Sequence, residues 1–65
     1  MVHVTIQPDA LIFKKLTDEQ LKYIEKHAGK LVIREHSMGY RVTGGQALLF
    51  QLLYNLALVY DIEMF

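Results

Sequence analysis

The stretch "VTGGQALLFQLLYNLALVY", residues 42–60, decides how this 65-residue chain folds. Two adjacent glycines lie near its start, and 12 of the 14 residues from Ala47 to Tyr60 are apolar. As a helix this run reaches roughly 21 Å, well short of the ~30 Å hydrocarbon core of a bilayer. We therefore predict a long apolar helix buried in a water-soluble fold, with no membrane association.

A repeated pattern predicts where this helix begins. Residues 42–47 read apolar, Thr, two residues, Gln, apolar, and residues 16–21 follow the same order. A threonine followed three residues later by glutamine is typical of a capping box at a helix N-terminus. The pattern predicts helix N-caps at Thr17 and Thr43. It is generic and indicates no particular family.

Gly44 and Gly45 would then occupy the first helical turn, where glycine is unfavourable by up to about 1 kcal/mol per residue. Three explanations compete for this cost. Side chains there could clash with a neighbouring strand or a second subunit, which we favour. The corner between a hairpin and a helix could need unusual dihedral angles. Bare N–H groups could bind an anion, with Thr43, Gly44 and Gly45 forming the site.

The remaining segments predict an α+β fold. Residues 2–7 alternate apolar and polar side chains, as a half-buried strand does, and residues 30–42 are typical of a hairpin. Residues 10–16 fit a second strand or a short helix, and residues 60–65 fit a helix extension or an edge strand. We predict one domain, residues 1–65, in the order β(β)-α-β-β-α. Its antiparallel sheet is packed by a capped surface helix and by the long apolar C-terminal helix.

The long helix is too apolar for so small a chain to cover. Gln51 and Asn55 form one narrow polar stripe, either solvated or fixing the register of an interface, and apolar residues fill most of the circumference. We therefore expect a homo-oligomer, with a dimer favoured. The predicted interface comprises Leu48, Leu49, Gln51, Leu52, Asn55, Leu56 and Val59.

The composition argues against several classes of protein. Seven Lys and Arg balance seven Asp and Glu, whereas a dedicated nucleic-acid-binding domain usually has an excess of basic residues. There is no cysteine, which fits a cytoplasmic protein, and the N-terminal residues resemble no secretory signal. We expect neither a metal nor a cofactor.

Catalysis is not expected either, because the candidate acids and bases do not converge. Glu35 and His36 are neighbours that point to opposite faces of a strand, and Ser37 lies in a turn. A metal site would need His3 and His36 on neighbouring strands. The other candidate acids and bases are His27, Asp9 and Asp61.

The hairpin instead predicts a binding surface, because cations and an aromatic ring lie close together in it. These residues are Lys30, Arg34, His36, Tyr40 and Arg41. Lys14 and Lys15 would join them if their segment lies nearby. We expect a non-enzymatic module that binds and modulates another protein, as a regulator or an inhibitor. The alternative is a small nucleic-acid-binding regulator that uses the basic hairpin of residues 30–42.

Overall fold

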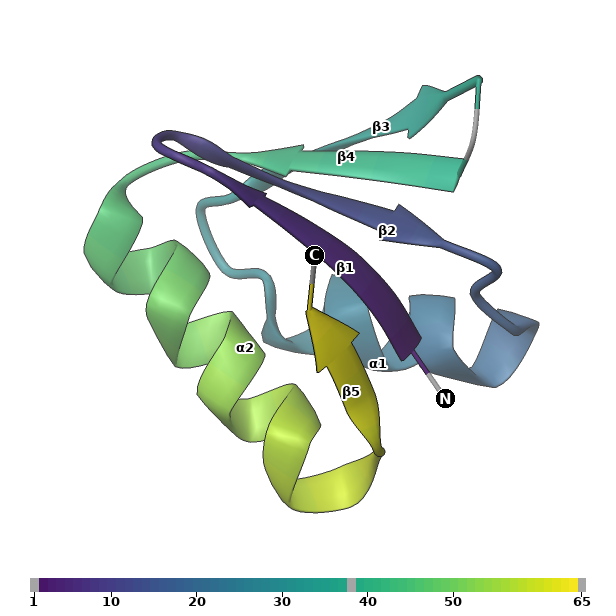
Figure 1. The fold of residues 1–65 in the computed structure, drawn as a ribbon. Coiled ribbons are helices and arrows are strands. Elements are labelled where there is room, and N and C mark those ends of the chain that lie inside the picture. Colours follow the sequence, from purple (N-terminus) through teal and green to yellow (C-terminus); the bar gives the residue numbers. More distant parts are fainter. Residues whose placement is uncertain (1, 38, 65) are drawn as a thin grey trace.

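A computed structural model describes residues 2–37 and 39–64 of the chain. Its fold is α+β, as predicted (Figure 1). The elements are β1 (Val2–Gln7), β2 (Ala10–Lys14), α1 (Asp18–His27), β3 (Val32–His36), β4 (Gly39–Thr43), α2 (Gln46–Val59) and β5 (Ile62–Met64). The predicted hairpin is therefore β3 and β4. The turn predicted for residues 37–39 includes Met38, which lies outside the described residues.

The five strands form one sheet in the order β3-β4-β2-β1-β5. Pairing is antiparallel from β3 to β1, whereas β5 pairs with β1 in parallel. The expected wholly antiparallel sheet is thus corrected to a mixed one. The two open assignments are also resolved, because residues 10–14 form a strand and residues 62–64 form a short edge strand.

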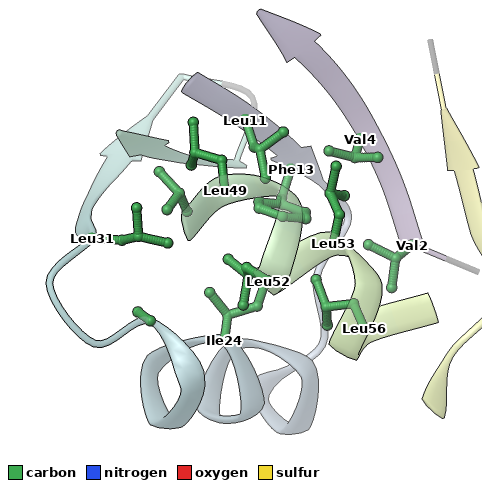
Figure 2. Close-up of a cluster of buried hydrophobic side chains, with 12 residues drawn as sticks. Val2, Val4, Leu11, Phe13, Ile24, Leu31, Leu49, Leu52, Leu53 and Leu56 are labelled. Carbon is green, nitrogen blue, oxygen red and sulfur yellow. The ribbon is translucent and has the colours of Figure 1, made fainter. Parts of the chain in front are cut away.

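The hydrophobic core lies between the sheet and the two helices. Val4, Phe13 and Val42 point from β1, β2 and β4 toward Ile24 of α1 and Leu52 of α2, and all five are buried. Figure 2 shows Val4, Phe13 and Ile24 converging on Leu52 and the neighbouring leucines of α2. Because strand residues of one parity meet both helices in a single cluster, α1 and α2 pack on the same face of the sheet.

The start of α1 follows the local sequence closely. The Thr17 hydroxyl accepts a hydrogen bond from the Gln20 N–H at 3.2 Å, and the Gln20 side chain accepts one from the Thr17 N–H at 3.0 Å. This is the predicted capping box. At the other end Gly29 has a φ of 59°, the left-handed conformation that commonly ends a helix.

The start of α2 differs from the prediction. Its N-cap is Gly45, which has no side chain to accept a hydrogen bond from the first turn. Thr43 is instead the last residue of β4, paired with Ala10 on one side and Val32 on the other. Because sheet pairing holds the Thr43 backbone on both sides, the predicted second capping box does not form.

The glycines themselves fit the first two explanations, and both apply to Gly44. Its φ is 153°, and an added Cβ would collide with the Leu31 side chain. Gly45 has an ordinary φ of −66° and open space around it. Crowding and the sharp corner after β4 therefore account for the first glycine only.

Tyr23 joins the two helices. Its hydroxyl donates a hydrogen bond to the Asn55 carbonyl oxygen of α2 at 3.2 Å. The centroid of its ring lies 4.3 Å from that of the His27 ring. The Tyr60 ring meets it edge-on, with the two centroids 5.6 Å apart. These contacts orient the C-terminal half of α2 against α1 and place the chain to enter β5.

Candidate functional site

The outer face of α2, defined by Phe50, Tyr54 and Leu58, is the most apolar exposed surface of a described helix. These three side chains are 53%, 62% and 68% exposed. Turning 100° per residue places them within a sector opposite the buried Leu52 and Leu56. Exposed large apolar side chains gathered in one sector are typical of a binding surface rather than of a solvated helix face.

An open groove of about 360 Å³ continues this surface between α2 and β5. It exists because the chain reverses direction after Val59 and returns along β1, which leaves a gap beside the last turns of α2. Met64 and Tyr54, both exposed, stand on its two sides. The lining residues are Leu53, Tyr54, Ala57, Tyr60, Asp61, Ile62 and Met64.

The predicted interface residues divide between the inside and the outside of the molecule. Leu49, Leu52 and Leu56 are at most 2% exposed and belong to the core, so their assignment to an interface is corrected. Leu48, Gln51 and Val59 are exposed, and Asn55 is half-buried. Sequence reasoning missed Phe50, Tyr54 and Leu58, which are all more than half exposed.

The polar pair on α2 bonds within the helix. The Gln51 side-chain N–H donates to the Asn55 side-chain oxygen at 3.5 Å, on an exposed surface. Because the Asn55 carbonyl accepts from Tyr23, this residue contributes both to the exposed polar stripe and to the contact between the helices.

The sheet face opposite the helices is a second surface. Directly paired residues lie on the same face of a sheet. The register therefore places Thr5, Ile12, Arg41 and Arg34 in one row across β1, β2, β4 and β3. Lys14 lies in the next row, with His3 on one side of it and Gly39 on the other, and His36 follows Gly39. Val32 lies on the same face, two residues before Arg34 on β3. These eight side chains (Thr5, Ile12, Arg41, Arg34, Lys14, His3, His36 and Val32) are called the open sheet face.

This face is basic among the described strand residues. Arg34 and Arg41 are exposed and Lys14 is half-buried. Among the described strands, the register places one carboxylate on this face, that of Glu63 on β5. Strand β1 lies between Glu63 and Lys14. Glu35 pairs with Tyr40 on the helix side of the sheet. Its side chain therefore leaves the sheet on the opposite face from the two arginines.

The predicted hairpin patch is only partly brought together. Arg34, His36 and Arg41 share the open sheet face, but Tyr40 points to its other side, and Lys30 lies in the loop before β3. Lys14 joins the group because β2 pairs with β4. From the sequence, Lys14 and Lys15 join the hairpin only if their segment lies nearby, and residues 10–16 could be a strand or a short helix.

The candidate anion site also changes. Thr43 is paired within the sheet, Gly44 is crowded by Leu31, and Gly45 alone lies at the start of α2. The three residues therefore do not act together as one loop around a ligand, and this helix start provides no built site.

The two histidines considered as metal ligands lie apart in the sheet. His3 and His36 lie on β1 and β3, with β2 and β4 between them, so they are not on neighbouring strands. Across residues 2–37 and 39–64, no three His, Asp or Glu side chains come close enough together to hold a metal ion.

One pKa is clearly shifted. The pKa of Tyr60 is raised, first because the phenol is partly removed from water, and then because the Glu19 carboxylate and Tyr23 lie nearby. This tyrosine is half-buried at the junction of α1, α2 and β5. Its shift reflects that packing and indicates no chemistry with a substrate.

Within the part of the chain that the structure describes, neither helix is long and apolar enough to cross a membrane. Comparison with protein-family models, curated proteins and solved structures gives no match to this chain.

Proposed function

We propose that this protein is a small non-enzymatic interaction module that self-associates through the outer face of α2 and, in that form, binds and modulates another protein. The observation that carries the proposal is the exposure of Phe50, Tyr54 and Leu58 on one helix. A second copy is the occupant we favour, because a two-fold axis lets one apolar helix face cover another of identical composition.

The available area supports this proposal. An aromatic side chain presents about 150–250 Å² when fully exposed, so a half-exposed one contributes on the order of 100 Å². With Leu58 and Met64, which are also exposed, the patch reaches on the order of 300–400 Å² of apolar surface. A stable interface buries about 800 Å² per partner. The polar stripe of Gln51 and Asn55, with the exposed Leu48 and Val59 beyond it, would supply the rest.

Sedimentation velocity over a range of micromolar concentrations tests the proposal. The wild-type chain is expected to sediment as a dimer. The double variant Phe50→Glu and Leu58→Lys is expected to sediment as a monomer with an unchanged circular dichroism spectrum. Both positions are exposed, so the change removes apolar surface without opening the core.

The matched control is Lys22→Glu with Glu25→Lys. It also changes two exposed helix residues and leaves the net charge unaltered. We expect this control to remain dimeric. A wild-type chain that sediments as a folded monomer at every concentration would refute self-association through α2.

A further inference from the structure

We infer that the open sheet face is the surface that binds the partner, and that the partner presents an acidic protein segment. This inference rests on the proposed function and adds to it the place and the chemistry of recognition. The open sheet face carries three cations, Lys14, Arg34 and Arg41, which come from the adjacent strands β2, β3 and β4.

The two arginines are the centre of this surface. Arg34 and Arg41 are directly paired across β3 and β4, which brings their Cβ atoms to about 5 Å from each other. Like charges directly opposite one another are unfavourable in a sheet. A carboxylate bound between two guanidinium groups would relieve this repulsion, because each group offers parallel N–H donors that match its two oxygens.

Gly39 lies in the row next to the arginines, paired with Lys14 on one side and with His36 on the other. Glycine is required at this position because an added Cβ would collide with the Phe13 carbonyl oxygen of β2. No side chain therefore separates Lys14 from His36 in this row, and Arg41 lies two residues along the same strand.

An acidic protein fits this face better than a nucleic acid does. Proteins that bind single strands stack bases on aromatic rings, and Tyr40 of the hairpin points to the helix side. The face also carries Ile12 and Val32, which suit apolar side chains of a protein segment. The whole chain has no excess of positive charge, whereas binding to a phosphate backbone is driven by neutralising many phosphates.

The test compares two probes of equal length, a fluorescein-labelled poly-glutamate peptide and a fluorescein-labelled poly-thymidine oligonucleotide. Fluorescence anisotropy at low salt is expected to show binding of the peptide, weakening as salt is added. The variant Arg34→Glu with Arg41→Glu is expected to lower the peptide affinity by about tenfold or more. The variant Arg34→Lys with Arg41→Lys keeps the charge but loses the paired donors, and an intermediate affinity is expected.

The control is Lys22→Glu with Lys26→Glu, which makes the same change of charge on the exposed side of α1. It is expected to bind the peptide nearly as well as wild type. Circular dichroism checks that every variant is folded. Equal loss of affinity in the control, tighter binding of the oligonucleotide, or no binding of the peptide would each overturn the inference.

The same samples separate this inference from the proposed function. The monomeric variant Phe50→Glu with Leu58→Lys keeps the open sheet face unchanged and is expected to bind the peptide with one site per chain. If the wild-type chain proves monomeric yet binds the peptide through its arginines, self-association fails and the binding surface stands. If the wild-type chain is dimeric but does not bind the peptide, self-association stands and the proposed binding surface fails.

Discussion

Gly44 and Gly45 are adjacent residues in different environments. Gly44 has a backbone angle that L-amino acids with side chains rarely adopt, and its missing Cβ gives space to Leu31. Gly45 is the N-cap of α2 and has ordinary dihedral angles. The same substitution at the two positions should therefore have opposite effects.

We expect Gly44→Ser to lower the free energy of unfolding by about 1–3 kcal/mol, through backbone strain and overlap with Leu31. Gly45→Ser should raise it by about 0.5 kcal/mol, since serine adds a capping acceptor and restricts the unfolded chain. Urea denaturation of both variants measures the two changes in the free energy of unfolding. Equal effects of the two substitutions would contradict the assigned roles.

Tyr60 gives a prediction about alkaline pH. Its pKa is raised in the folded protein by desolvation and by Glu19, whereas an unfolded tyrosine titrates near pH 10. The folded state therefore holds this proton more strongly. Its contribution to stability is complete below about pH 10 and is lost as the pH rises through the folded-state pKa.

The variant Tyr60→Phe has no such proton to lose. Between about pH 9 and about pH 11, its melting temperature should fall less steeply than that of the wild-type protein. Thermal denaturation followed by circular dichroism provides the comparison. Parallel curves for the two proteins would show that Tyr60 does not contribute to the alkaline loss of stability.

Helix α2 has two apolar faces, one buried in the core and one exposed to solvent. Leu52 is 1% exposed in the core, while Leu58 on the same helix is 68% exposed. Because apolar residues surround almost the whole helix, the sequence offers no contrast from which to choose the inward face. The sequence therefore predicts an interface at Leu49, Leu52 and Leu56, whereas the exposed apolar residues include Phe50, Tyr54 and Leu58.

The two faces predict different responses to the same substitution. Leu52→Ala should cost about 2–5 kcal/mol because it leaves a cavity in the core. Leu58→Ala should change the stability of the monomer by no more than about 0.5 kcal/mol. Denaturation at high dilution, where assembly does not contribute, measures both. Similar losses at the two positions would mean that the helix is turned differently.

The elements that the sequence predicted well are those fixed by nearby residues. The capping box of α1 needs only Thr17 and Gln20, three residues apart. The order of β1, α1, the hairpin and α2 follows from periodicity in the same local way. The prediction was wrong at Thr43, where pairing with strands distant in the sequence overrides the local signal.

Candidate surfaces depend even more on distant contacts. Lys14 reaches the arginines only through the pairing of β2 with β4, and the groove beside α2 exists only because β5 returns along β1. A parallel pair between the two ends of a chain has no local signal, since its register is set by the core that both strands cover. The basic hairpin could be predicted, but not which of its side chains share a face.

The outer face of α2 and the open sheet face lie on opposite sides of the molecule. The helices pack on one face of the sheet (Figure 1), and the basic residues lie on the other. A dimer formed through α2 would therefore hold two open sheet faces away from its interface. Such a module would bind a partner with two acidic segments more tightly than one face could, by raising the effective concentration of the second.

Site-specific cross-linking tests the central claim, that the outer face of α2 meets a second copy. The chain contains no cysteine, so a single introduced cysteine can be linked only to another molecule. Gln51→Cys places it on the exposed side of α2, and Lys22→Cys places it on the exposed side of α1. A short bis-maleimide is the reagent, because it tolerates a wider separation than a disulfide does.

We predict that Gln51→Cys gives a cross-linked dimer as the main product at micromolar concentration, while Lys22→Cys remains largely monomeric. Cross-linking that is equally efficient at both positions, or absent at Gln51→Cys, would contradict association through α2.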